Sequence, residues 1–264
     1  WRMVVSHLLF LQNFSEQFAY ALNGVYWTLP TEFGFYLLLP AIAWLAWRMR
    51  RGDSRSWLWL CLVLVGFSVV WRFIAFQGVA DQPVGKRVFA LMQLPGLIDH
   101  FAIGILFAWG FIEAQRAGCP ITGRLSDALT VLGLLGMVMV MAFFEVIYEQ
   151  YWDGHPYLFV GYSLTALCMG AFIVGTAGGG RVSRALFGNP LAVTLGLISY
   201  SLYLWHFPVL LWVNQLLDTS GVKGDRLWWL VAIAIPASIA LAALSYWFIE
   251  RPFLSRRPRA APPA

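Results

Sequence analysis

The segment GVYWTLPTEFGFYLLLP, residues 24–40, decides how the rest of the chain is read. It places the carboxylate of Glu32 at the mouth of a strongly apolar run, and Tyr36 follows four residues later. In a helix these two side chains lie on one face. A carboxylate at the start of a membrane span is costly unless it is paired, hydrated or used in function. A second interpretation stays open, in which Glu32 caps the helix N-terminus with Thr31 beside it.

The composition around this segment predicts a membrane protein. Hydrophobic residues make up 60% of the 264 residues and charged residues 12%, against about 25% charged in soluble domains. Apolar runs of span length recur along the chain, so we predict an all-α fold, a polytopic transmembrane helix bundle with about seven complete spans. The predicted spans are residues 28–47, 57–76, 96–112, 128–147, 157–176, 191–216 and 227–249. Residues 1–250 then form one transmembrane domain, and residues 251–264 a basic, Pro-rich tail.

Basic residues are distributed unevenly between alternate loops. One set of loops holds twelve arginines, in residues 48–55, 116–124, 181–184 and 251–259. The other set holds four basic residues, in 86–87 and 223–226. Arginine and lysine favour the cytoplasmic side, so the tail is expected in the cytoplasm and Glu32 near the outer face. The net charge of +5 is thus attributed to orientation in a lipid bilayer and not to a nucleic-acid partner. The three cysteines have no metal-ligand spacing, and we expect no metal and no bound cofactor.

Two further polar positions lie near outer helix ends. Arg72 lies near the outer end of the second span, where it can either snorkel to the interface or pair with Glu32 at a similar depth. Asp99 and His100 begin the third span. Because adjacent residues on a helix do not face each other, at most one of them is expected in a shared cavity, and Asp99 is favoured.

The sixth predicted span carries a polar stripe in ISYSLYLWHFPVL, residues 198–210. Ser199, Tyr203 and His206 fall at positions i, i+4 and i+7, which is one helical face. Such a stripe in an apolar span indicates either a polar cavity or hydrogen bonds between helices. Both interpretations stay open.

Four segments together resemble signatures of the acyltransferase family 3 membrane proteins, in the expected order. They are YWTLPTEFGFYLLLP (26–40), LPGLIDHFAIGIL (94–106), ISYSLYLWHFPVL (198–210) and SYWFIERPF (245–253). The resemblance implies an integral O-acyltransferase of a bacterial inner membrane. Such proteins move an acyl group, commonly acetyl, from a cytoplasmic donor such as acyl-CoA to a hydroxyl of a cell-envelope or exported carbohydrate.

The resemblance also gives candidate residues. Trp27 and Glu32 match a W…E motif. Acyl transfer to a hydroxyl needs a general base for the departing proton and donors aimed at the developing oxyanion. The catalytic candidates are Glu32, Arg72 and His206. The candidates for substrate binding are Trp27, Tyr36, Asp99, Ser199, Tyr200 and Tyr203.

The chain departs from the family pattern in three features. Thr28 stands where serine is usual, and the early helix with Arg, ten variable residues and His is absent, as is the loop with paired arginines. We expect both elements upstream of Trp1, and we expect this fragment alone to be inactive. Two alternatives stay open: a membrane transporter or flippase of a glycoconjugate, and a non-catalytic fragment that lacks the Arg–His helix.

Overall fold

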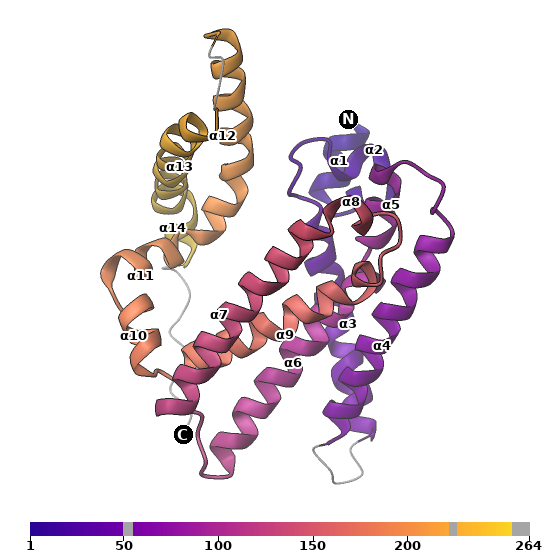
Figure 1. Ribbon diagram of the computed structural model, residues 1–264, viewed down its shortest axis with the longest axis vertical. Helices are drawn as coiled ribbons and strands as arrows, with labels where there is room; N and C mark the ends of the chain where they lie inside the picture. Colours follow the sequence, from indigo (N-terminus) through magenta and orange to yellow (C-terminus); the bar gives the residue numbers. More distant parts are fainter. Residues whose placement is uncertain (50–54, 222–225, 255–264) are drawn as a thin grey trace. The chain divides into compact units, whose positions relative to one another are not determined.

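The computed structural model describes residues 1–49, 55–221 and 226–254, and every regular element in them is helical (Figure 1). Six helices are long and apolar enough to cross a membrane, or seven if the bent pair α11–α12 counts as one span. The predicted all-α fold with about seven spans is confirmed. The elements are α1 Arg2–Leu8, η1 Gln12–Phe14, α2 Glu16–Ala19, α3 Thr28–Met49, α4 Ser56–Gln77, α5 Val84–Leu91, α6 Leu94–Arg116, α7 Gly123–Val146, α8 Tyr148–Tyr151, α9 Tyr157–Ala177, α10 Arg181–Phe187, α11 Pro190–Leu197, α12 Ser199–Thr219, α13 Arg226–Ser245, η2 Tyr246–Glu250 and α14 Arg251–Leu254.

The chain divides into two compact units. Unit 1 is Trp1–Ala19 with Trp27–Phe187, and unit 2 is Tyr20–Tyr26 with Gly188–Ala264. In unit 1, α4 packs on α6, α6 packs on α9, and α7 packs on α9 along most of its length. Helices α7 and α9 lie side by side in Figure 1.

Glycines allow α7 and α9 to approach each other closely. A Cβ atom on Gly133 of α7 would lie 2.5 Å from the backbone nitrogen of Phe172, and one on Gly175 of α9 would lie 2.4 Å from that of Thr130. The Ser126 hydroxyl of α7 also donates to the Gly175 carbonyl at 2.7 Å. Small residues at the interface and a hydroxyl bonded across it are the usual means of helix association in lipid.

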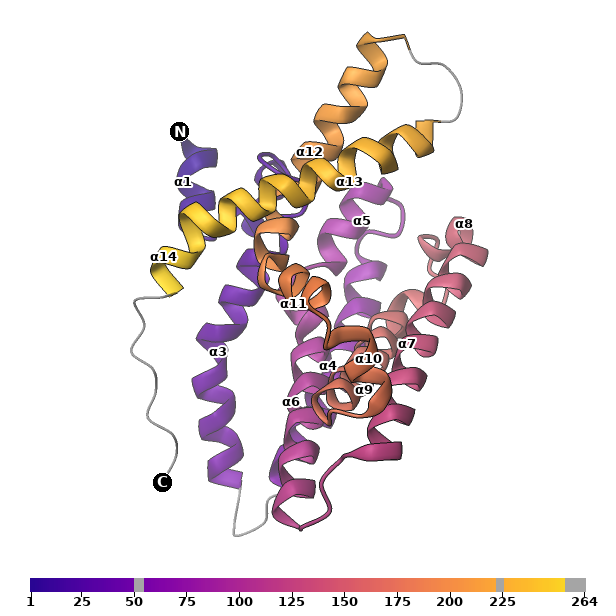
Figure 2. The ribbon, with the colours of Figure 1, turned by 90° about the vertical axis from the view of Figure 1, so that its left-hand side faces the viewer.

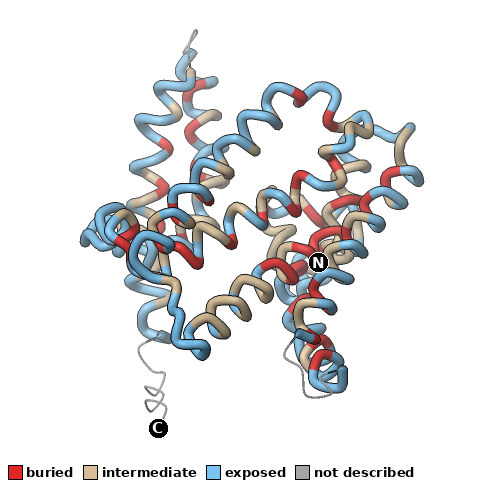
Figure 3. Tube along the Cα trace, turned by 60° about the horizontal axis from the view of Figure 1, so that its bottom comes forward, coloured by how far each residue is buried: buried red, intermediate tan, exposed pale blue. Residues whose placement is uncertain are grey.

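The burial pattern fits a lipid environment. Exposed residues recur along the helices in Figure 3. They include large apolar side chains such as Met139, which is 71% exposed. The fully buried side chains, by contrast, include Arg72, Asp99 and Ser68. These polar side chains are buried beside apolar ones, because hydrocarbon cannot satisfy their hydrogen bonds.

In unit 2, α12 and α13 form a pair, and α13 leads through η2 into α14 (Figure 2). Val209, Val213 and Leu217 of α12 pack with Ala234 of α13. The span predicted over residues 191–216 is not one straight helix, because α11 and α12 meet at a 71° bend. Gly196 lies in the last turn of α11, where its low helix propensity weakens a continuous helix.

The predicted tail begins in a helix, since Arg251–Leu254 forms α14. Residues 255–264 lie outside the described residues. So do several of the basic residues used to orient the chain, namely Arg50, Arg51, Lys223, Arg256, Arg257 and Arg259.

Candidate functional site

A buried ion pair joins α4 to α6 in unit 1. Arg72 Nη2 lies 2.9 Å from Asp99 Oδ2, and both side chains are 0% exposed. Ser163 of α9 completes the contact, because its hydroxyl accepts from Arg72 at 3.1 Å and donates to Asp99 at 2.5 Å. Three helices thus meet at one charged cluster.

The remaining donors of Arg72 bind backbone carbonyls. Nε donates to Phe159 O at 2.9 Å, and Nη1 donates to Gly96 O at 2.5 Å. Gly96 is required here, because a Cβ atom would lie 2.3 Å from the carbonyl oxygen of Leu91. A buried charge is tolerated only when it is paired and hydrogen-bonded. This guanidinium is paired with Asp99, and each of its three nitrogens donates a hydrogen bond.

The predicted pair between Glu32 and Arg72 is wrong. Arg72 faces α6 and α9, where Asp99 supplies the counter-charge. Glu32 is exposed on α3, and none of the ion pairs among the described residues involves it. The capping interpretation also fails, because α3 begins at Thr28 and Thr31 Oγ1 donates back to the Trp27 carbonyl at 3.3 Å. Tyr36 is 60% exposed on the same helix.

His100 belongs to the same cluster as Asp99. Its Nδ1 lies 3.0 Å from Asp99 Oδ1, and its backbone N–H donates to the same oxygen at 3.0 Å. The His100 side chain is 36% exposed and lines a cavity of about 320 Å³. The prediction that Asp99 faces a cavity is wrong: Asp99 is fully buried, and His100 lines the cavity instead. In the sequence, the signal for this contact is that an aspartate directly precedes a histidine.

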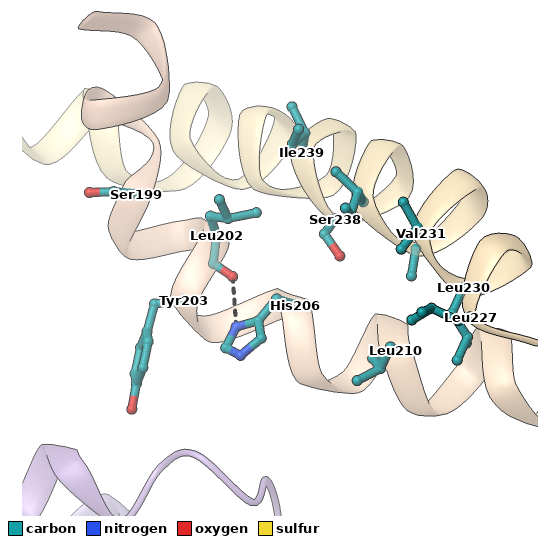
Figure 4. Close-up of a pocket in the computed structure, with 12 residues that line it drawn as sticks. Ser199, Leu202, Tyr203, His206, Leu210, Leu227, Leu230, Val231, Ser238 and Ile239 are labelled. Carbon is teal, nitrogen blue, oxygen red and sulfur yellow. Dashed lines mark hydrogen bonds between the residues drawn. The ribbon is translucent and has the colours of Figure 1, made fainter. Parts of the chain in front are cut away.

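The polar stripe of α12 lines a cavity in unit 2. Ser199, Tyr203 and His206 are among the residues that line a cavity of about 760 Å³, together with residues of α13. In Figure 4 the ring of Tyr203 points away from α13. The predicted shared face is confirmed. The lining is otherwise mainly aliphatic, with one further hydroxyl from Ser238 of α13.

Hydrogen bonds fix the two larger polar side chains of this stripe. His206 Nδ1 lies 3.2 Å from the Leu202 carbonyl, and the Tyr203 hydroxyl donates to the Val25 carbonyl at 2.7 Å. The stripe therefore combines a cavity with a hydrogen bond to a neighbouring segment of unit 2. Tyr200 is 53% exposed and is not among the residues that line the cavity.

The last sequence signature forms a second polar contact in unit 2. The buried hydroxyl of Ser201 donates to a carboxylate oxygen of Glu250 in η2. The Arg251 guanidinium lies 4.0 Å from the ring centroid of Trp247. Within the described residues, no group of three or more metal-ligating side chains is arranged to hold a metal ion.

Comparison with known proteins identifies the family. A family model described as "Acyltransferase domain" matches residues 1–247. The chain belongs to acyltransferase family 3. The resemblance seen in the four signatures is confirmed, and the long apolar helices of this family member make it an integral membrane protein.

Two proteins with similar sequences are named as O-acetyltransferases. The peptidoglycan O-acetyltransferase OatA of Listeria monocytogenes is 25% identical over 232 residues, which cover 86% of this chain and 34% of that protein. The O-acetyltransferase OatA of Staphylococcus aureus is 25% identical over 244 residues, covering 91% of this chain and 37% of that protein. The chain thus spans little more than a third of the length of these relatives. No solved structure matches it.

Proposed function

We propose that the protein is a membrane O-acyltransferase. It moves an acetyl group from a cytoplasmic acyl-CoA donor to a hydroxyl of a cell-envelope carbohydrate. The observation that carries this proposal is the family match over residues 1–247, together with relatives named as O-acetyltransferases over most of the chain. The acceptor class follows the word peptidoglycan in the name of the Listeria relative.

The reaction assigns roles to the candidate residues. The acceptor hydroxyl attacks the thioester carbonyl, loses its proton to a base and displaces the thiolate, while negative charge builds on the carbonyl oxygen. In our proposal His206, on α12, takes part in this reaction. Its Nδ1–H donates to the Leu202 carbonyl, so Nε2 carries the lone pair available to a substrate hydroxyl. Ser199 and Tyr203, which line the same cavity, then bind substrate beside it. Tyr200 is a candidate for substrate binding outside that lining.

On α3, Glu32 is the proposed catalytic carboxylate, with Trp27 and Tyr36 as neighbouring binding residues. Glu32 is exposed without an ion-pair partner among the described residues, so it is available to a cationic group or a substrate hydroxyl. Arg72 and Asp99 are fully buried. We therefore propose that they act as positioning residues and do not touch the substrate.

The charge distribution supports an orientation. Arg116 and Arg124 flank one short connection, between α6 and α7. The opposite connections hold Asp81, Glu149 and Asp153 with few basic residues. We propose a bacterial inner membrane location with the C-terminus in the cytoplasm, since arginines favour that side.

The test uses membranes that contain the protein encoded by the complete reading frame. They are incubated with labelled acetyl-CoA, and label is measured in envelope polysaccharide. We expect Glu32→Gln to lower transfer at least about 100-fold while membrane insertion is unchanged. The matched control is Glu145→Gln, which alters another exposed carboxylate and should leave transfer unchanged. Full acylation by the Glu32 variant removes that residue from the mechanism.

One observation favours a transporter. The bent pair α11–α12 resembles the broken helices of secondary transporters. Those folds, however, carry such breaks at corresponding places in two halves, and the described residues contain one. Movement of a glycoconjugate across the membrane without consumption of acetyl-CoA would establish transport instead.

A further inference from the structure

The cavity beside His100 is separate from the α12–α13 cavity and lies within unit 1. It is lined by residues of α6, α7 and α9, by Tyr151 of α8 and by Trp152, and it has a volume of about 320 Å³. This is at the lower end of the range for ligand pockets, about 300 to 1,000 Å³, and suits one ring of a small ligand. Its lining includes the aromatic rings of Phe144, Tyr151, Trp152, Tyr157 and Tyr162.

The protonation pattern of His100 follows from its partner. Asp99 is an ionised carboxylate beside a guanidinium, so it can only accept hydrogen bonds. The His100 Nδ1 that lies 3.0 Å from Oδ1 must therefore carry the hydrogen. In the neutral ring this leaves a lone pair on Nε2. No hydrogen bond to Nε2 occurs within the described part of the chain.

Asp99 holds His100 rigidly because its own position is fixed by four donors. Oδ2 accepts from Arg72 and Ser163, and Oδ1 accepts from the backbone N–H and the ring of His100. A carboxylate has about four lone-pair sites, so this one is saturated by protein. It can offer no hydrogen bond to a ligand, and the cluster reaches the cavity through His100.

The aromatic wall is also held in place. The rings of Phe144 and Tyr151 meet edge to face at 4.7 Å, and those of Tyr151 and Trp152 at 4.8 Å. The Tyr157 hydroxyl donates to Val140 O at 3.1 Å. Such rings offer broad apolar faces at low entropic cost. A sugar ring presents a C–H face to such a surface and hydroxyls at its edge.

We propose that this cavity binds one sugar ring of the carbohydrate acceptor, with a ring hydroxyl donating to Nε2 of His100 while the aromatic side chains cover the C–H face. This inference rests on the proposed function. The cavity lies where α6 and α9 begin and α7 ends. The connections at this end are the arginine-poor ones, so the site faces the side from which an envelope carbohydrate would approach.

The test measures saccharide binding directly. The full-length protein in detergent is titrated with an N-acetylglucosamine tetrasaccharide and with maltotetraose, and the dissociation constant is read from tryptophan fluorescence. We expect wild type to bind at least one of them and His100→Gln to weaken that binding roughly tenfold, the usual scale for one lost hydrogen bond. The control His155→Gln changes a nearby histidine outside the cavity lining and should leave the constant within about twofold.

Acetyl transfer by the same variants separates this inference from the proposed function. We expect His100→Gln to raise the acceptor KM. If wild type binds a saccharide but transfers no acetyl group, the proposed function is wrong and the proposed sugar site stands. Transfer by wild type with unchanged binding and KM in His100→Gln overturns the site alone, as does failure of wild type to bind either saccharide. If His100→Gln does not fold, Trp152→Ala removes part of the aromatic wall and must weaken binding to a similar extent.

Discussion

The buried cluster makes a strong prediction about stability. Asp99→Ala removes the acceptor for four donors and leaves the Arg72 guanidinium at 0% exposure without a counter-charge. Breaking a buried ion pair from one side costs about 3 to 5 kcal/mol. At about 2 to 4 °C per kcal/mol for a chain of this size, the unfolding midpoint should fall by roughly 6 to 20 °C.

The assay is thermal unfolding of the purified protein in detergent, followed by tryptophan fluorescence. The double variant Arg72→Met with Asp99→Leu replaces the pair by apolar side chains of similar volume. It should recover to within about 1 kcal/mol of wild type, because no uncompensated charge remains. The control is Glu113→Ala, which breaks an exposed pair with Arg116 spaced i,i+3 and should cost no more than about 0.5 kcal/mol. An Asp99→Ala protein as stable as wild type, or a double variant no better than the single one, refutes the reasoning.

Two further predictions concern packing and orientation. Gly175→Ala places a methyl group 2.4 Å from the backbone of α7 and should lower stability by about 1 to 3 kcal/mol in the same thermal assay. The control Gly104→Ala has nothing within 4 Å of the added methyl group and should leave stability unchanged. Equal unfolding midpoints for the two variants would contradict the close approach of α7 and α9. Cys119 is exposed and Cys61 is buried, and Cys119 lies in the arginine-rich connection. A membrane-impermeant maleimide should therefore label inverted vesicles but not intact spheroplasts, and Cys119→Ser should remove the label. Labelling of spheroplasts would reverse the proposed orientation.

The long helices could be predicted well from the sequence, because a helix that spans lipid needs a long apolar run with polar ends. The spans predicted at 28–47 and 157–176 correspond to α3 Thr28–Met49 and α9 Tyr157–Ala177. The bend between α11 and α12 was not predicted, because hydropathy carries no information about a change of helix direction inside an apolar run. The short helix α5 was missed too, as its eight residues are far below span length.

The candidate site was predictable only where its residues share one helix. The period of 3.6 residues placed Ser199, Tyr203 and His206 on one face, and all three line the α12–α13 cavity. The partner of Arg72 depends on how each helix is rotated about its axis and packed against the others. Glu32 and Asp99 were both expected near the outer ends of their helices, so sequence offered no means to choose between them.

The Asp99–His100 contact shows where the facing rule for helices stops applying. That rule concerns side chains that extend outward to meet across a turn. Asp99 is short enough for Oδ1 to reach back to the N–H of the next residue, as aspartate does in local side-chain to backbone bonds. The same oxygen then also lies within reach of the neighbouring imidazole. An acid immediately before a histidine in a helix can therefore fix the histidine tautomer without facing it. In this chain that local geometry connects a fully buried ion pair to a cavity whose lining includes His100 but neither Arg72 nor Asp99.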